Sequence, residues 1–168
     1  MTVGEITLHG GRRALVDDDD YERLRGVRWH VMKLGGPKAK LAYWYAARGG
    51  REGEPANVLM HREIMGVGPS EIVDHVNGDT LDNRRCNLRV ATRSQNCANR
   101  QKNVGRVGYK GVYRPRGSQR YYATITAVGE TYPLGSFEDQ VEAALAYDMK
   151  AIELFGPFAR PNLLEAVS

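Results

Sequence analysis

The chain has 168 residues, of which 42% are hydrophobic, and its formal net charge is +4. This is enough apolar material for one domain or two small ones, but no stretch approaches the roughly 20 apolar residues that span a bilayer. The N-terminus lacks the basic start and apolar core of a signal peptide, so we expect a cytoplasmic protein without a membrane partner. Cys86 and Cys97 form no C-x-x-C pair, which argues against a structural zinc site.

The first part of the chain is predicted to be rich in short strands. Residues 5–8 and 13–16 alternate around a Gly-Gly turn, and residues 28–33 and 41–47 are rich in Trp, Tyr and Val. A short helix is predicted over residues 58–65, because Gly66 follows as a typical helix end. These segments predict a β-rich N-terminal region.

The middle of the chain predicts a strand, a turn, a strand and a helix in succession. An extended segment, Ile72–His75, leads into the turn at Asn77-Gly78-Asp79, and a second strand follows over Leu88–Ala91. Thr92 and Gln95 fit a capping box, so a helix should begin there and run to about residue 99.

This segment carries residue types suited to phosphodiester hydrolysis, which needs a base, a divalent cation and a group that orients the base. His75 suits the first role because an imidazole titrates near neutral pH, at a pKa of about 6.5. Asp74 and Asn96 offer the hard oxygen ligands that Mg²⁺ or Mn²⁺ prefers. Neighbours on a regular strand point to opposite faces. We therefore expect an irregular strand end at Asp74 and His75, which the Asn-Gly turn favours.

The last part of the chain predicts a small α+β unit. After a basic, polar linker near residues 100–107, three strand-like runs cover residues 109–115, 121–127 and 130–135. A helix follows the caps at Ser136 and Asp139 and ends before Gly156-Pro157, and its expected core face consists of Val141, Ala144, Leu145, Met149 and Ile152.

Positive charge is concentrated between Asn83 and Gly129, where the sequence has no acidic residue. Such a run is typical of a polyanion-binding surface, because each phosphate contact releases condensed counterions. A solvated basic face is the alternative, but interleaved tyrosines favour nucleic acid. The eleven cations are Arg84, Arg85, Arg89, Arg93, Arg100, Lys102, Arg106, Lys110, Arg114, Arg116 and Arg120.

The run DHVNGDTLDNRRCNLRVATRSQN, residues 74–96, resembles the ββα-metal core of phage and bacterial HNH homing endonucleases. The resemblance implies that Asp74 and Asn96 bind one Mg²⁺ or Mn²⁺ per active site, with no zinc, and that His75 is the general base. It further implies that Asn87 orients this base and braces the two strands. The run ALVDDDDYERL and the segment LMHR, residues 59–62, extend the similarity over nearly all of residues 5–100.

Residues 108–161 resemble the APETALA/ethylene-response-factor DNA-binding domain, on the runs GYKGVY, YYATIT, LGSF and EAALAYD. The resemblance implies that a three-stranded sheet enters the major groove with the helix packed behind it. Several strand positions that are Arg or Trp in plant domains differ here, so the target sequence does not carry over. The candidate DNA contacts on the sheet are Tyr113, Arg114, Arg116, Arg120, Tyr122, Thr124 and Thr126.

Together these features predict an α+β fold, with a ββα-metal nuclease domain over residues 1–102, a linker over 103–107 and a DNA-binding domain over 108–165. We expect a homing-type, site-specific endonuclease that nicks double-stranded DNA, as a monomer or weak dimer on DNA, at the nucleoid of a bacterial or phage-infected cell. A non-catalytic DNA-binding regulator is the alternative. An RNA-binding module fits less well, since the major groove of duplex RNA is too deep and narrow for a sheet.

Two features are set aside. The carboxylates of Asp17 to Asp20 are adjacent and do not converge on one point, and Asp is favoured at the start of a helix, so we interpret them as structural. His61 belongs to the LMHR segment and could lie near the site, but we interpret it as a packed or phosphate-facing histidine.

Overall fold

The computed structural model describes residues 3–34, 43–100 and 107–164. The chain forms two compact units, Met1–Ala91 and Thr92–Ser168. This division differs from the predicted domains, because the helix expected to end the nuclease domain packs with the second unit. The predicted linker lies outside the described residues except for Val107. No helix within those ranges is long and apolar enough to cross a membrane.

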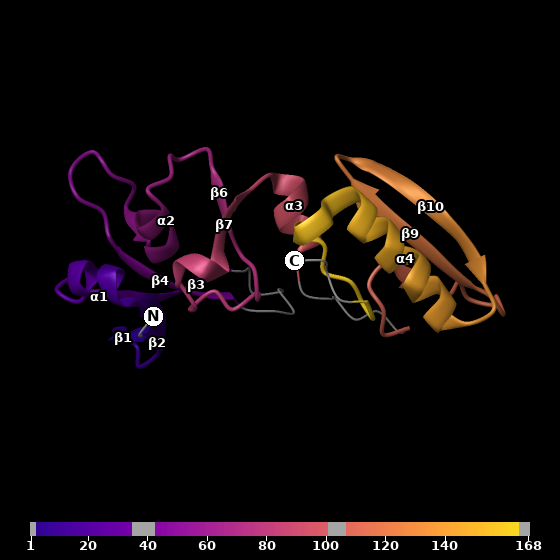
Figure 1. The fold of residues 1–168 in the computed structure, drawn as a ribbon, viewed down its shortest axis with the longest axis horizontal. Coiled ribbons are helices and arrows are strands. Elements are labelled where there is room, and N and C mark those ends of the chain that lie inside the picture. Colours follow the sequence, from indigo (N-terminus) through magenta and orange to yellow (C-terminus); the bar gives the residue numbers. More distant parts are fainter. Residues whose placement is uncertain (1–2, 35–42, 101–106, 165–168) are drawn as a thin grey trace. The chain divides into compact units, whose positions relative to one another are not determined.

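The first unit contains three small antiparallel sheets (Figure 1). One pairs β1 with β2, the second has the order β3-β4-β5, and the third pairs β6 with β7. The predicted helix over 58–65 begins only at Met60, because the preceding residues pair with β4 as a strand. The elements are β1 (Val3–Thr7), β2 (Arg13–Asp17), α1 (Asp18–Leu24), β3 (His30–Leu34), β4 (Tyr43–Gly49), β5 (Asn57–Leu59), α2 (Met60–Met65), β6 (Ile72–His75), η1 (Arg85–Asn87) and β7 (Leu88–Ala91).

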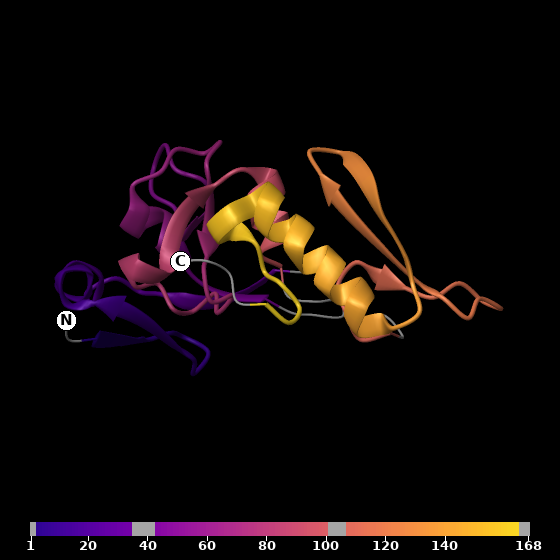
Figure 2. The ribbon, with the colours of Figure 1, turned by 45° about the vertical axis from the view of Figure 1, so that its right-hand side comes forward.

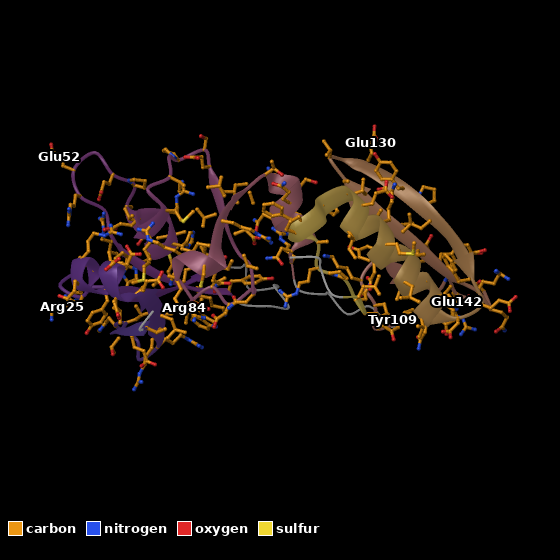
Figure 3. The ribbon with its side chains drawn as sticks, viewed as in Figure 1. Arg25, Glu52, Arg84, Tyr109, Glu130 and Glu142 are labelled. Atoms are coloured by element: carbon orange, nitrogen blue, oxygen red, sulfur yellow. The ribbon has the colours of Figure 1, made fainter. Side chains whose placement is uncertain are left out.

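The core of the first unit is built around Trp29. Its side chain is 2% exposed and its indole Nε1 donates a hydrogen bond to the carbonyl of Leu24 at 3.0 Å. Leu8, Val16 and Met60 complete the fully buried centre, so that the β1–β2 pair, α1 and α2 share one core. Charged side chains such as Arg25 and Glu52 extend outward from it (Figure 3).

The acidic run at residues 17–20 is structural, as the sequence predicted. Asp17 is the N-cap residue of α1, and Asp18, Asp19 and Asp20 occupy its first turn, where the helix dipole favours negative charge. Asp20 is buried and pairs with Arg23 and Arg85. Burial works to raise its pKa, but these hydrogen bonds and charges hold the pKa below its ordinary value.

The second unit has the predicted three-stranded sheet and long helix, with the strand order β10-β9-β8. Both views show α4 lying along one face of the sheet (Figures 1 and 2). The predicted capping box at Thr92 is present, with Gln95 N donating to the threonine hydroxyl at 3.2 Å. The elements are α3 (Arg93–Ala98), β8 (Val112–Tyr113), β9 (Tyr121–Ala127), β10 (Glu130–Phe137), α4 (Gln140–Phe155) and η2 (Gly156–Phe158).

The buried face of α4 differs in part from the predicted one. Ala144 is buried as expected, but Val141 and Met149 are 38% and 68% exposed, because Tyr147 and Asp148 occupy the inward positions instead. The Tyr147 ring packs so closely on Gly111, at a φ of 74°, that a side chain there would overlap it.

Asp148 joins α4 to a later segment of the second unit. Its carboxylate is fully buried and accepts hydrogen bonds from the backbone N–H groups of Asn162, Leu163 and Leu164, at 2.6 to 3.1 Å. The Asn162 side chain in turn bonds both the N–H and the carbonyl of Lys110. The residues before β8, helix α4 and residues 162–164 are therefore tied together by one carboxylate and one amide.

Candidate active site

Asp74 and His75 occupy the C-terminal end of β6, and both are 5% exposed. The strand pairs with β7 in regular register, Asp74 with Arg89 and His75 with Leu88. The expected irregular strand end is therefore not observed in this pairing. The two side chains leave a regular strand toward opposite faces, so a phosphate that reaches both must lie at the end or the unpaired edge of this two-stranded sheet.

His75 lies in a cluster of three rings. Its ring centroid is 5.0 Å from that of His61, edge-on at 81°, and 6.2 Å from that of Tyr45, while Tyr45 and His61 are 5.5 Å apart. His75 Nε2 also lies 3.4 Å from the side-chain oxygen of Asn83. These neighbours come from β4, α2 and the loop before η1, so three segments besides β6 itself contact the imidazole.

Burial determines the protonation state of both imidazoles. It lowers the pKa of His75, although Asn83 and nearby carboxylates, Asp74 first among them, oppose the shift. Burial, with smaller contributions from His75 and Arg62, lowers the pKa of His61 to about 3. Both rings are consequently neutral at neutral pH, and a neutral imidazole is the form that can accept a proton. His61 is a packed histidine, as predicted, and it also contacts the candidate base.

The Asp74 carboxylate is paired with Arg89, its neighbour across the strands. One oxygen of Asp74 accepts from Arg89 Nε at 2.9 Å and lies 2.8 Å from Nη2. Arg89 was selected as a DNA-contacting cation from the sequence, but here its charge neutralises a buried carboxylate. A second cation on Asp74 would have to share this carboxylate with the guanidinium.

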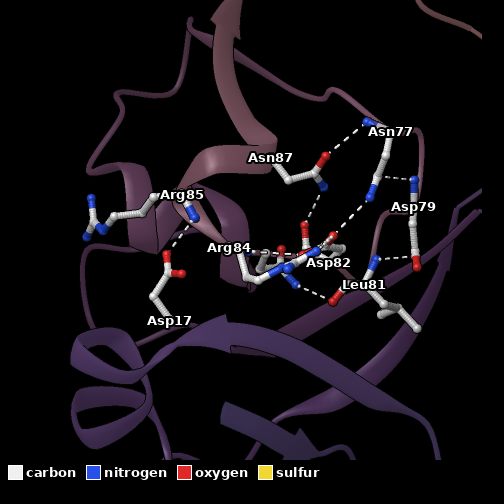
Figure 4. Close-up of polar contacts among 9 residues, drawn as sticks. Asp17, Asn77, Asp79, Leu81, Asp82, Arg84, Arg85 and Asn87 are labelled. Carbon is white, nitrogen blue, oxygen red and sulfur yellow. Dashed lines mark hydrogen bonds and ion pairs between the residues drawn. The ribbon is translucent and has the colours of Figure 1, made fainter. Parts of the chain in front are cut away.

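Asn87 braces the loop between β6 and β7. Its side-chain oxygen accepts from Asn77 N at 2.9 Å and its amide donates to the Asp82 carbonyl at 2.7 Å (Figure 4). These bonds agree with the bracing role implied for Asn87, whereas the hydrogen-bonding neighbour observed for His75 is Asn83. Sequence reasoning did not select Asn83, although its place in the NGDTLDN run near the predicted turn was a usable signal.

Two further cations selected from the sequence are paired with acids in the same region. Arg84 forms hydrogen bonds of 2.6 and 2.7 Å with Asp82 and holds the pKa of that carboxyl below its ordinary value (Figure 4). Arg85 donates its backbone N–H to Asp17 and its guanidinium to Asp20, at 2.8 Å each. The basic run after the strand turn thus fastens the loop to α1.

Asn96 lies on α3 in the second unit and is half-buried. Within the described ranges, no three His, Cys, Asp or Glu side chains are grouped closely enough to hold a metal ion. Cys86 and Cys97 are free and exposed. The donors available are a carboxylate and amide oxygens, a set that suits Mg²⁺ or Mn²⁺ better than zinc.

The sheet of the second unit presents one polar face. Alternate residues of β9 that include Ala123 and Ile125 face the helix and are buried, while Tyr122 and Thr124 lie on the other face. Tyr113 is the cross-strand partner of Tyr122, and their rings stack at 5.7 Å. The predicted face therefore exists and displays two stacked tyrosines.

The cations of the second unit fall into two groups. Arg114 lies over the ring of Tyr121 and bonds the Ser118 carbonyl, while Arg120 forms an exposed pair with Glu138. Lys110 instead turns inward to the carbonyls of Ala98 and Arg100, and burial lowers its pKa to about 8. Of the remaining candidates, Lys102 lies outside the described residues, and the exposed ones are Arg93, Arg100 and Arg116.

Two comparisons relate the chain to known proteins. Residues 57–98, from β5 to the end of α3, match a family model described as HNH endonuclease. Over 173 aligned positions the chain is 32% identical to a protein of Acanthamoeba polyphaga mimivirus whose name is uncharacterized HNH endonuclease, covering 98% of this chain and 83% of that protein.

Proposed function

Because the chain belongs to the HNH endonuclease family, and so to the nucleases that act on DNA, we propose that it is a site-specific, homing-type enzyme that hydrolyses phosphodiester bonds in double-stranded DNA. The observation that carries this proposal is that the buried imidazole of His75 and the buried carboxylate of Asp74 occupy consecutive positions at the end of β6. The second unit supplies the sequence-reading part, through the exposed face of its sheet.

His75 acts as the general base. Its ring is neutral, and contacts with Asn83, His61 and Tyr45 limit its rotation. A fixed base needs no reorganisation when it takes a proton from the attacking water, and general-base catalysis typically contributes about 10²- to 10⁴-fold in rate. Asn87 does not bond to His75 directly in this proposal; it holds the loop that carries Asn83, and Asn83 contacts the imidazole.

The metal site is proposed on the chemistry of its donors. Asp74 and Asn96 are the residues that would hold one Mg²⁺ or Mn²⁺, and such an ion would neutralise charge on the scissile phosphate and the leaving 3′-oxygen. Asp74 is already balanced by Arg89, so a cation there would share the carboxylate with the guanidinium unless a bound phosphate drew the guanidinium away. We therefore expect metal affinity to be weak without DNA and stronger with it.

One site of this kind contacts one strand, so the protein should nick duplex DNA as a monomer. A break in both strands would then require a second engagement or a weak dimer on DNA. Supercoiled plasmid that carries the target distinguishes these outcomes, since a nick yields open circles and a double break yields linear DNA.

The test is conversion of target plasmid with Mg²⁺, Mn²⁺ or EDTA, by the natural chain and by His75→Ala. We expect metal-dependent nicking that falls by roughly 10²- to 10⁴-fold in the variant, with DNA affinity unchanged in EDTA. Binding without nicking on a true target would instead identify a non-catalytic DNA-binding regulator. Paramagnetic relaxation of water by Mn²⁺ in the presence of DNA should weaken in Asp74→Asn and Asn96→Ala, which tests the two ligands without relying on activity.

A further inference from the structure

Trp44 on β4 carries two cations over its indole ring. The guanidinium carbon of Arg12 lies 4.5 Å from the ring centroid, and Lys33 Nζ lies 5.5 Å from it. Lys33 is the cross-strand partner of Trp44, and Arg12 comes from the turn between β1 and β2, which hydrogen-bonds to β3 through His9. We call Arg12, Lys33 and Trp44 the Trp44 surface.

Both cations of the Trp44 surface are exposed and available. Across the part of the first unit that the structure describes, neither side chain forms an ion pair or a hydrogen bond, and Arg12 is followed directly by Arg13, which pairs with Glu5 at 2.6 Å. The cations near the active site are the opposite case, because Arg84, Arg85 and Arg89 are all held by carboxylates. Among these cations, those without a partner in the described residues are therefore Arg12 and Lys33 of the Trp44 surface, and not the three beside the active site.

The position of Arg12 over the Trp44 ring leaves its N–H donors available to an anion. The contact with the ring is electrostatic and uses none of the five N–H groups in hydrogen bonds to oxygen. The ring also restricts the side chain, so that less conformational entropy is lost when a phosphate binds.

The Trp44 surface is connected to the catalytic rings through one strand. Thr80, in the loop after His75, donates its hydroxyl to the carbonyl of Trp44 at 2.7 Å. The next residue, Tyr45, packs against His61 and His75. Because neighbours on a strand point to opposite faces, Tyr45 faces the two imidazoles from one side of β4, while Trp44 lies on the other side with Arg12 and Lys33 over its ring.

On the basis of the proposed nuclease function, we propose that the Trp44 surface binds the phosphate backbone of duplex DNA beside the bond that is cut. Guanidinium and ammonium groups that no carboxylate neutralises bind backbone phosphates by charge and hydrogen bonding. The Thr80 bond and the Tyr45 contacts connect this surface to the segment that carries His75. Phosphate contacts of this kind fix register and orientation without reading sequence.

The test is the salt dependence of binding of the full chain to a short duplex of random sequence, in EDTA. Each phosphate contact contributes about 0.9 to the slope of log affinity against log salt concentration, so Arg12→Gln with Lys33→Gln should lower the slope by roughly 2. Arg13→Gln is the control for a single charge, because it removes one positive charge from the adjacent exposed position, where Glu5 already pairs with it. We expect its slope to match that of the natural chain.

Three results would be decisive. No binding by the natural chain would refute the proposed function itself. An unchanged salt slope in the double variant, or an equal decrease of the slope in Arg13→Gln, would show that the Trp44 surface does not bind DNA. Either result would leave the proposed nuclease function unaffected. As a second readout, iodide quenching of tryptophan emission should decrease when DNA covers Trp44, and this protection should disappear in Trp44→Phe, since the other tryptophan, Trp29, is buried.

Discussion

The two units place their charges differently. In the first unit the cations around the site are fixed by carboxylates, and one of these pairs, Arg85 with Asp20, joins residues 65 positions apart. In the second unit Arg114 lies over a tyrosine and bonds only carbonyl and amide oxygens, while acidic side chains such as Glu130 and Glu142 extend away from the fold (Figure 3). A basic stretch of sequence therefore becomes structural in one unit and remains available to a ligand in the other.

This difference follows from what each unit must stabilise. The first unit buries Asp20, Asp74 and Asp82, and a buried carboxylate is costly unless it is paired and hydrogen-bonded. The sheet of the second unit buries alanine and isoleucine against its helix and has no such requirement on its outer face. Removing a buried partner from one unit should therefore have different consequences from removing an exposed cation from the other.

Asp148→Ala should destabilise the second unit most. It leaves the buried N–H groups of Asn162, Leu163 and Leu164 without their acceptor, at about 1–3 kcal/mol for each unsatisfied group. When unfolding in urea is followed by circular dichroism, the part of the signal that comes from the second unit should be lost at a lower urea concentration. Because Trp29 and Trp44 both lie in the first unit, their emission should keep its midpoint. A common shift of both signals would show that the units unfold together.

Asn87→Ala should have a smaller effect, confined to the first unit. The Asn77 N–H and the Asp82 carbonyl lose their partners, so the free energy of unfolding should fall by about 1–3 kcal/mol. Tryptophan emission measures this change directly. Asn87→Asp serves as the control, because it retains the acceptor for Asn77 and loses only the donor, and a loss as large as that of the alanine variant would contradict the assignment.

His61 should make the stability of the first unit depend on pH. Its pKa is about 3 in the fold and 6.5 ordinarily, so between these values the unfolded chain binds more protons and stability falls as the pH is lowered. One such group contributes at most about 1.4 kcal/mol per pH unit, and nothing above pH 6.5. His61→Phe should reduce the slope measured from pH 6.5 downward. Tyr45→Phe, which removes no imidazole from the same cluster, should leave it unchanged.

The smallest effect expected is on DNA binding by single cations. Arg114→Gln should lower the slope of log affinity against log salt by about 1, whereas Arg85→Gln should leave it nearly unchanged, because Asp20 already neutralises Arg85. Equal slopes for the two variants would mean that pairing within the fold does not decide which cations meet DNA.

Local patterns carried most of what could be predicted from the sequence. The capping box at Thr92, strand β6 and the helix after Asp139 depend on residues close together in the chain, and they are found where the patterns placed them. Contacts between segments that are distant in the chain could not be predicted from the sequence. No periodicity links His61 to His75, and the bond from Arg85 N to Asp17 joins residues 68 positions apart. A candidate site could therefore be proposed from the DH pair, whereas the groups that contact its imidazole could not be predicted.

Asp148 accepts four hydrogen bonds from a segment that is synthesised later, residues 162–164. Two come from the backbone N–H and the side-chain Nδ2 of Asn162, and one each from the N–H groups of Leu163 and Leu164. These bonds set an order of folding during synthesis. Residues up to 91 can leave the ribosome and form the first unit, while the second must wait with an unsatisfied carboxylate on α4 until residues 162–164 emerge. A nascent chain would thus fold the strand that carries Asp74 and His75 before the segments tied by Asp148 are complete.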